Sequence, residues 1–571
     1  MAGMRRAAGN AGGRVPAQAH GKDATHVAYF SMEICLDASI PTYSGGLGVL
    51  AGDMLHSLAD LGVAAVGVSL LYKKGYFRQR INNGWQTEEP VEWDPEEHME
   101  RLPGKVNVEI EGRKVAVGAW RYLLKGKTST IPVIFLDTDL PENGEEERNI
   151  TLQLYIEDPR RRLSQEIVLG VGGAKMLEKL GIRPEKYHMN EGHSTLLTLE
   201  LYRRSNAKNR IEDVRKRCVF TTHTPVPAGH DKFQKELAQS LLGELADSSL
   251  EDEIYFEDML NLTYLGLRFS ERINGVAKKH TEVSKGMFPG YQIESITNGV
   301  HSARWTSAPF RTLYSKYVPG WDDEPSSLRY ALNIPNSEVW DAHMEAKKAL
   351  LKYVEKTCKV KMEQDVFTIG FARRAAAYKR ADMLFSDMDK LREISKKHKL
   401  QIVYGGKAHP YDTEGKRIMQ GVIAKMEALR GDIACCYLEE YDVEVAKLAT
   451  SGVDLWLNTP MRPLEASGTS GMKAAHNGVP QFSVMDGWWL EGHVENITGW
   501  SIGKRPEESP ESRTDEDARD LYSKLEYVIL PAYYDYKQEW IRIMKHAISV
   551  NASFFNSHRM VSEYIQKSYF K

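Results

Sequence analysis

Short apolar runs, loops rich in glycine or histidine, and amphipathic stretches alternate along most of the chain. Runs rich in β-branched and aromatic residues predict strands, and stretches with apolar residues three and four positions apart predict helices. The predicted strands are residues 26–32, 217–222, 366–372, 400–404, 432–438, 453–457 and 480–484. The predicted helices follow the loop at 41–48 as far as residue 61 and then occupy the regions around 383–391, 443–450, 470–476 and most of 516–571.

This alternation predicts an α/β fold, because neighbouring parallel strands need a crossover connection, usually a helix. We expect two doubly wound domains that face each other across a cleft, with ligands bound at the carboxyl ends of the strands. The pattern thins between residues 291 and 340, where we place the domain junction. We expect a flexible tail without an apolar signal segment at 1–23. Two α/β domains should follow, at 24–299 and 300–515, and C-terminal helices at 516–571 should pack across both domains.

The charge balance and the apolar content exclude several classes of protein. Lys and Arg total 75 against 78 for Asp and Glu, so the net charge of −3 offers no whole-chain attraction to nucleic acid or to an anionic membrane. No apolar stretch is long enough to predict a membrane-spanning helix. The five cysteines are scattered, odd in number and free of any CxxC pair, so we expect a cytoplasmic protein without a disulfide framework.

The most informative loop, residues 462–473, follows a predicted strand and enters a predicted helix. Its last six residues contain two glycines, two hydroxyl residues and a lysine: Gly468, Gly471, Thr469, Ser470 and Lys473. Backbone N–H groups at the start of a helix bind anions, so the loop is either an anion site or a capped helix with a solvated lysine. It is not a nucleotide P-loop, because the glycines are too close together and the lysine does not directly follow the second one.

Two further loops follow predicted strands. The first, Gly46-x-Gly48-x-x-Ala51, matches a loose dinucleotide-binding fingerprint, but a lone match is a weak signal and a tight strand–helix turn is the plainer interpretation. The second, residues 373–380, carries four cations in eight residues. A solvated charged face and a phosphate clamp at the end of a strand both fit this pattern.

The sequence does not predict a metal site. There is no HExxH motif, His223 and His230 are seven residues apart, and Glu191 with His193 forms a single pair. Buried histidines with hydrogen-bond partners explain these residues.

Seven blocks of the chain occur in the order YFSMEICLDASIPTYSGGLGVLAGD, YHMNEGHSTLL, FTTHTPVPAGHDKF, ITNGVHSARW, FTIGFARRAAAYKR, GGKAHP and RPLEASGTSGMKAAHNG. With these blocks the chain resembles the α-glucan phosphorylases, which act on glycogen, starch or maltodextrin, and most closely their short bacterial and archaeal branch. The blocks run from Tyr29 to Gly478, about four-fifths of the chain. The EASGTSGMK block is highly specific to that family.

The resemblance implies a GT-B glycosyltransferase fold of two Rossmann-like domains, with glucan and phosphate on the N-terminal side and the cofactor on the C-terminal side. It implies pyridoxal 5′-phosphate, bound as a Schiff base to Lys473. In the family, the phosphate of this cofactor lies against the substrate phosphate and relays a proton, and two phosphates held together cannot both stay fully ionised near neutral pH. The implied reaction is reversible, retaining phosphorolysis of α-1,4-glucans from the non-reducing end to α-D-glucose 1-phosphate. The implied assembly is a homodimer, and we expect no AMP or phosphorylation control.

The resemblance also assigns roles to individual residues. The implied catalytic residues are Lys473, Arg374, Lys379, His223 and Glu465. The implied cofactor contacts are Lys473, Thr469, Ser470, Gly471, Arg373, Tyr441 and Trp305. The implied substrate contacts are Gly45, Gly46, Glu33, Asn298, Tyr378, Ser467 and Gly468. In this assignment Arg374 and Lys379 grip the substrate phosphate, and the main-chain carbonyl of His223 faces the reacting sugar.

The chain departs from the animal enzymes of the family at three matched positions. Cys35 takes the place of a tyrosine that stacks on the cofactor, and Ala376 takes the place of a histidine in the phosphate-gripping motif. Arg373 replaces a lysine on the cofactor side and keeps its charge.

Other functions make different demands on these residues. A retaining nucleotide-sugar glucosyltransferase of the same fold would need no inorganic phosphate. A hydrolase would need two carboxylates about 5–10 Å apart, for which Glu465 and Glu491 are the available pair. A catalytically inactive glucan-binding protein would bind sugar without a cofactor, and a transaminase-type enzyme would turn over an amino donor. Lys473 in its glycine-rich setting favours the phosphorylase.

Overall fold

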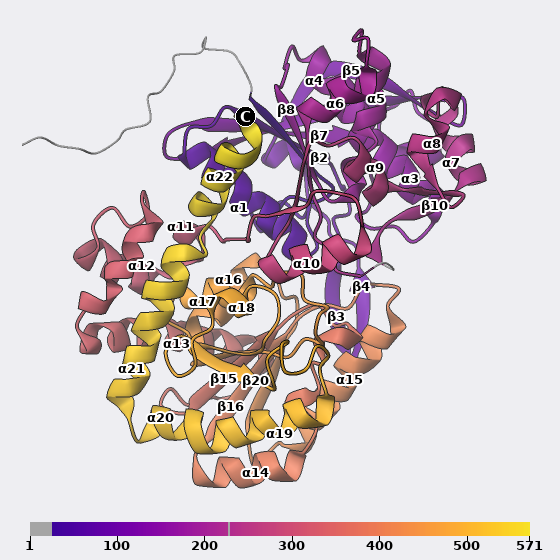
Figure 1. Ribbon diagram of the computed structural model, residues 1–571. Coiled ribbons are helices and arrows are strands. Elements are labelled where there is room, and N and C mark those ends of the chain that lie inside the picture. Colours follow the sequence, from indigo (N-terminus) through magenta and orange to yellow (C-terminus); the bar gives the residue numbers. More distant parts are fainter. Residues whose placement is uncertain (1–25, 227–228, 571) are drawn as a thin grey trace, which may run out of the picture.

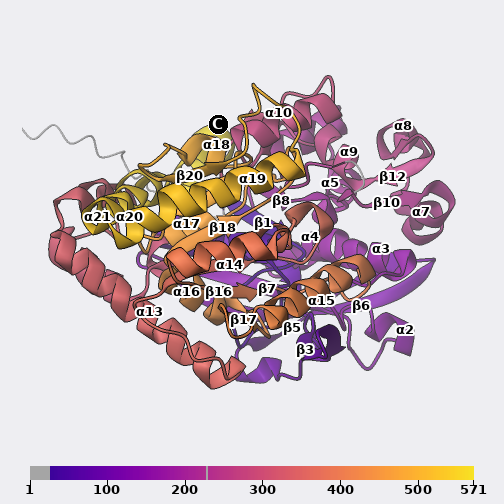
Figure 2. The same cartoon turned by 90° about the horizontal axis from the view of Figure 1, so that it is seen from below.

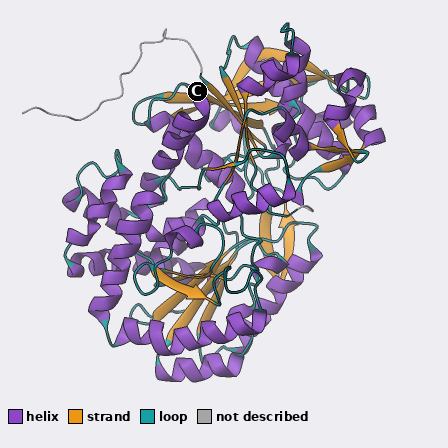
Figure 3. Ribbon diagram, in the orientation of Figure 1, coloured by secondary structure: helices purple, strands orange, loops and turns teal. Residues whose placement is uncertain are grey.

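The computed structural model describes residues 26–226 and 229–570, so the tail predicted at 1–23 lies outside the described residues. Figure 1 shows two α/β halves, with the last helices of the chain running along both of them. Helices pack around the sheet of each half (Figure 3). The predicted fold class, α/β with parallel sheets, is confirmed.

The N-terminal half is built on a nine-stranded sheet in the order β14-β13-β9-β8-β1-β2-β7-β6-β5. Its strands are β1 (Val27–Ser31), β2 (Ala65–Leu70), β5 (Glu100–Ile110), β6 (Arg113–Lys125), β7 (Thr130–Asp137), β8 (Lys186–Asn190), β9 (Cys218–Thr221), β13 (Arg272–Gly275) and β14 (Glu294–Ser295). The strands from β14 to β7 pair in parallel, whereas β7, β6 and β5 form an antiparallel meander at one edge. The sequence pattern did not predict this meander.

The C-terminal half is built on a six-stranded, fully parallel sheet in the order β17-β16-β15-β18-β19-β20. Its strands are β15 (Phe367–Ala372), β16 (Leu400–Gly405), β17 (Ala434–Leu438), β18 (Leu455–Asn458), β19 (Gln481–Val484) and β20 (Gly499–Ile502). In both halves the first parallel strand of the chain lies between the second and the fourth, which is the doubly wound order. Between β15 and β18 the order reverses, and a reversal of this kind opens a crevice for a ligand at the carboxyl ends.

The predicted strands agree with the observed ones to within two residues at either end. The single helix expected around 383–391 is instead a 3₁₀ turn at Met383–Phe385 followed by α14 (Met388–Lys397). Asp387 causes the break, because its side chain caps α14 by accepting the N–H of Lys390 at 2.9 Å.

The stretch in which the pattern thins contains short helices. They are α11 (Ser302–Trp305), α12 (Ala308–Tyr317), a 3₁₀ helix at Pro325–Asn333 and the start of α13 (Asn336–Cys358). Short helices bury few residues each, so their periodicity is hard to detect in the sequence.

The C-terminal helices contact both halves. In the C-terminal half, α19 (Thr514–Lys524) and α21 (Lys537–His546) contribute Leu521 and Trp540 to the same core as the strand residue Phe367, and Figure 2 shows α19 running along that half beside α14. Further along, α22 (Ser557–Tyr564) packs on α1 (Gly46–Asp60) of the N-terminal half. None of the helices described is both long enough and apolar enough to cross a lipid bilayer.

A buried ion pair attaches α13 to the C-terminal sheet. The Nζ atom of Lys347 lies 2.6 Å from one carboxylate oxygen of Asp454, and His343 Nε2 lies 2.8 Å from the other. All three side chains are almost fully buried. Burial opposes the charge of Asp454, but Lys347 and His343 hold the pKa of this carboxyl below its usual value. The carboxylate also accepts the N–H of Thr368 at 2.7 Å, so the pair fixes the start of β15.

We expect Lys347→Met to lower the free energy of unfolding of the C-terminal half by about 3–5 kcal/mol, because Asp454 would stay buried without its cation. Thermal and urea unfolding followed by tryptophan fluorescence would measure this loss. Lys352→Met, at an exposed position of the same helix, is the matched control. Equal stability of the two variants would contradict the prediction.

Candidate active site

The loop after β18 leads into α17 (Ser470–Ala475), the segment with most of the predicted cofactor residues. Gly468 has a left-handed backbone with φ of +77°, which glycine adopts without strain. At Gly471 a Cβ atom would lie 1.4 Å from the side-chain amide oxygen of Gln481, so a larger residue there would displace that side chain. Thr469 is the N-cap residue of α17, and its side chain accepts no N–H of the helix. The N–H groups of the first turn are therefore available to another acceptor.

Lys473 lies on α17 with its amine inside the protein. Its Nζ atom is 4.0 Å from the centre of the Trp305 ring. Burial lowers the pKa of Lys473 to about 8, and the charges of Arg304 and Arg373 act in the same direction. Within the described residues its amine has no carboxylate partner, since the nearby Asp53 pairs with Arg304.

A second group of charges follows β15. The Glu465 carboxylate binds the Arg373 guanidinium through two contacts of 2.9 Å and the Lys379 amine through one of 2.6 Å. Burial alone would raise the pKa of Glu465, but these two cations lower it to about 2. Glu465 therefore stays ionised and neutralises part of the positive charge of both side chains.

Arg374 has different surroundings. Its side chain is exposed, and it forms no ion pair with a carboxylate in the described part of the chain. The protein around it disfavours its charge, whereas three tyrosines favour it, namely Tyr378, Tyr76 and Tyr155. Two of these tyrosines belong to the N-terminal half, so Arg374 faces that half. A guanidinium without a carboxylate partner is suited to bind an incoming anion.

The glycine loop before α1 is held by Glu33. The Glu33 carboxylate accepts the N–H groups of Ser44 at 2.5 Å and Gly45 at 3.2 Å, and the hydroxyl of Tyr155 at 2.8 Å. A Cβ atom at Gly45 or Gly46 would meet no atom within 4 Å, so these glycines border open space. The start of α1 thus has room for a ligand.

The remaining predicted residues differ in their surroundings. His223 follows β9, and burial lowers the pKa of its ring to about 3, so the ring is neutral. Asn298 and Ser467 are buried, and Asn298 Oδ1 and Ser467 Oγ have no hydrogen-bond partner among the described residues. Both atoms are free to hydrogen-bond to a ligand or to water. Tyr441 packs against the apolar cluster that contains Trp305.

The contacts therefore join Arg373, Lys379 and Glu465 directly, and they place Lys473 against Trp305. They do not join His223 or Asn298 to this group, since the recorded contacts of those two residues are made elsewhere.

Sequence reasoning missed Asp53, which connects α1 with α11. Its buried carboxylate accepts hydrogen bonds from Trp305 Nε1 at 2.8 Å, Arg304 Nη1 at 3.1 Å and the N–H of His301 at 3.2 Å. Trp305 in turn covers the amine of Lys473. The signal that was available is an aspartate inside the run of apolar residues and glycines at 47–55.

Asp60, His301 and His558 place possible metal-binding atoms within 4.8 Å of one another. His301 Nε2 lies 2.8 Å from Asp60 Oδ2, and His301 Nδ1 accepts the N–H of Arg304 at 3.2 Å. The proton of this ring therefore belongs on Nε2, which leaves that atom no lone pair for a metal. Hydrogen bonding accounts for the cluster.

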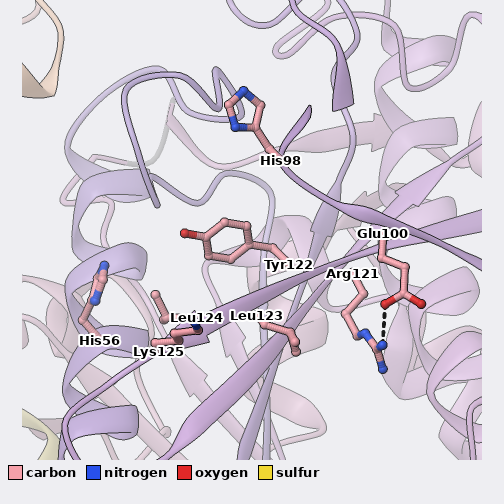
Figure 4. Close-up of a pocket in the computed structure, with 8 residues that line it drawn as sticks. All are labelled: His56, His98, Glu100, Arg121, Tyr122, Leu123, Leu124 and Lys125. Atoms are coloured by element: carbon pink, nitrogen blue, oxygen red, sulfur yellow. Dashed lines mark hydrogen bonds and ion pairs between the residues drawn. The ribbon is translucent and has the colours of Figure 1, made fainter. Parts of the chain in front are cut away.

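A surface hollow of about 520 Å³ lies beside β5, β6 and α1 (Figure 4). His56, Tyr122 and the ion-paired Arg121 and Glu100 line it, and none of the predicted site residues does.

A family model described as carbohydrate phosphorylase matches residues 36–164 and 228–527. The chain belongs to the carbohydrate phosphorylase family. The resemblance inferred from the seven sequence blocks is thereby confirmed. The chain is 38% identical to a maltodextrin phosphorylase of Thermococcus litoralis, over 95% of this chain and 70% of that protein. It is 35% identical to a glycogen phosphorylase of Aquifex aeolicus, over 95% of this chain and 86% of that protein. It is 34% identical to a glycogen phosphorylase of Mycobacterium tuberculosis, over 95% of this chain and 71% of that protein.

We expect the low pKa of Lys473 to make its amine reactive toward acetic anhydride at a lower pH than an ordinary lysine, in protein from which any bound aldehyde has been removed. Because the neutral amine is the nucleophile, the rate should rise about tenfold per pH unit up to pH 8 and then level off, whereas an ordinary lysine continues to gain up to about pH 10.4. Peptide mass spectrometry would follow the modified residue, and Lys473→Arg would remove the signal. A rate that still rises steeply above pH 9 would show that burial does not depress this pKa.

Proposed function

We propose that this phosphorylase cleaves α-1,4-glucans such as maltodextrin, glycogen or starch from the non-reducing end with inorganic phosphate, reversibly and with retention, to give α-D-glucose 1-phosphate. Membership of the family and the names of the relatives support the substrate class. The proposal rests on the different partners of the four cations in the site. Glu465 pairs with Arg373 and Lys379 and offsets part of their positive charge, whereas Arg374 and Lys473 have no carboxylate partner within the described residues.

We propose a GT-B fold with domains at 24–299 and 300–515 and bridging helices at 516–571. The doubly wound strand order in both sheets supports two similar domains. The packing of α22 on α1 supports a bridging role for the last helices.

The residues around Lys473 fit pyridoxal 5′-phosphate. A buried amine with a pKa of about 8 is readily deprotonated and can hold an aldehyde. The N–H groups of residues 469–471 have no acceptor among the described residues and can hold a phosphate. Trp305 and Tyr441 supply aromatic walls. When bound, this cofactor supplies a phosphate group that exchanges a proton with the substrate phosphate.

The chain's own residues bind and orient the substrates in this proposal. Arg374 and Lys379 bind the substrate phosphate, which brings its charge into a region with excess positive charge. Glu465 holds Lys379 in place by its 2.6 Å contact. Ser467 Oγ and Asn298 Oδ1 are unpaired and can hydrogen-bond to glucose hydroxyls, as can the carboxylate of Glu465 beside Gly468.

We also propose a cytoplasmic homodimer whose partners are the glucan, inorganic phosphate and glucose 1-phosphate, with neither nucleic acid nor membrane involved. The five cysteines are free thiols, which suits a reducing compartment. The dimer is carried over from the family resemblance alone.

The proposed function is tested by incubating the protein, loaded with cofactor, with maltodextrin and inorganic phosphate. Glucose 1-phosphate should form in proportion to phosphate and be absent without it. Lys473→Ala should lose both the activity and the absorbance of bound cofactor. Consumption of a sugar nucleotide in place of phosphate would instead favour a glucosyltransferase.

We expect Arg374→Ala to raise the KM for phosphate strongly and to lower kcat/KM by an amount corresponding to about 2–5 kcal/mol, because a charged hydrogen-bond partner of the phosphate is lost. The KM for maltodextrin should change little. Steady-state kinetics with each substrate varied in turn would measure the two effects. Arg417→Ala, at an exposed position of the same half, is the control. A normal phosphate KM in Arg374→Ala would contradict the assignment.

A further inference from the structure

A hairpin from the N-terminal half lies on the C-terminal half. It consists of β3 (Arg78–Asn82) and β4 (Trp85–Glu89). Strand β4 packs beside α15 (Thr413–Ala428), as Figure 1 shows. Its two glutamines, Gln79 and Gln86, are fully buried. A buried amide must satisfy both donors and acceptors, so the partners of these glutamines indicate what the hairpin does.

The two glutamines bind the backbone of the loop that follows β16. Gln79 Nε2 donates to the carbonyl of Gly406 at 2.9 Å and to Gln86 Oε1 at 2.9 Å. Gln86 Oε1 accepts the N–H of Ala408 at 2.9 Å, and Gln86 Nε2 donates to the Ala408 carbonyl at 2.9 Å. Gln86 therefore satisfies both backbone groups of Ala408, as a neighbouring strand would.

The same loop holds the backbone on either side of Arg374. The N–H of Arg373 donates to the carbonyl of the last residue of β16 at 3.2 Å, and the N–H of Ala375 donates to the Lys407 carbonyl at 3.0 Å. Ala375 also forms a β-bridge with Ala408. Backbone pairing between the two segments thus continues beyond the C-terminal ends of β15 and β16. Any shift of the loop after β16 would therefore move Arg374 with it.

The hairpin also holds the loop that follows β17. The N–H of Gln79 donates to the Glu440 carboxylate at 2.5 Å, and the N–H of Ile81 donates to the Glu439 carboxylate at 2.7 Å. Gln79 Oε1 accepts the N–H of Glu440 at 3.0 Å. The next residue along the chain is Tyr441, one of the predicted cofactor contacts. The hairpin therefore fixes two loops at the carboxyl edge of the C-terminal sheet.

We propose that the β3–β4 hairpin is a positioning clamp, in which Gln79 and Gln86 hold the loop at 405–408 so that Arg374 binds the substrate phosphate. This inference rests on the proposed function. Arg374 has no carboxylate to orient it among the described residues, so its guanidinium is positioned by its own backbone together with the tyrosines beside it, Tyr378 above all. A planar guanidinium binds phosphate through directed hydrogen bonds, and small displacements weaken such contacts. Because the clamp comes from the other half, the phosphate site is complete only when the two halves are docked.

Gln86→Met tests the clamp, because methionine matches glutamine in length and size but cannot pair with Ala408. In the enzyme loaded with cofactor, the KM for inorganic phosphate should rise about tenfold, and the dissociation constant of phosphate in calorimetry without glucan should rise equally. The KM for maltodextrin should stay within about twofold. Gln79→Glu, which is isosteric and turns a donor to the Gly406 carbonyl into an acceptor, should act in the same direction and serves if Gln86→Met does not fold.

Gln401→Met is the matched control, because Gln401 is a buried amide near the opposite end of β16. Its amide nitrogen donates to the Glu363 carbonyl and to Thr368 Oγ1, both at 2.9 Å. This variant should lose thermal stability and keep its phosphate KM. If the clamp variants lose only stability, as the control does, the inference is wrong and the hairpin is merely structural. A wild-type enzyme that forms no glucose 1-phosphate would overturn the proposed function itself, separately from the clamp.

Discussion

Parallel pairing of strands is the constraint on which this protein depends. All strands of a parallel sheet end at the same edge, so the loops that follow them lie side by side there. In the C-terminal sheet this edge gathers Arg373, Arg374, the loop at 405–408 and Tyr441, which lie far apart in the sequence. The same constraint places Glu33 and His223 at one edge of the N-terminal sheet.

The second determinant is the cost of burying charge. Each ion taken out of water loses several kcal/mol of solvation free energy, and only a well-placed partner compensates for that loss. Glu465 satisfies this requirement for Arg373 and Lys379, and its depressed pKa reflects the strength of the pairing. Lys473 is the exception, because its amine is buried against an indole ring and its pKa falls accordingly. An amine buried without a carboxylate partner among the described residues reduces stability, and it is suited to chemistry that needs the neutral form.

Several separate connections hold the halves together around these groups. Asp53 on α1 binds Trp305 and Arg304 of α11, and α22 returns from the C-terminal half to pack on α1. The β3–β4 hairpin reaches in the other direction, from the N-terminal half to the loops of the C-terminal sheet. These connections lie at different places, so relative movement of the halves would disturb several of them at once.

The sequence by itself determined the alternation of strands and helices, the strands β15 to β19 of the C-terminal sheet to within two residues, and the family, because periodicity and local motifs are properties of short segments. It did not predict β20. It also named Arg373, Lys379 and Glu465, which the fold joins in one network. Only the tertiary structure decided which cations are neutralised, that Asp53 supports Trp305, and that Gln79 and Gln86 bind a loop more than 300 residues away. Such contacts join segments distant in the chain, and no local pattern of residues records which distant partner a buried polar group will meet.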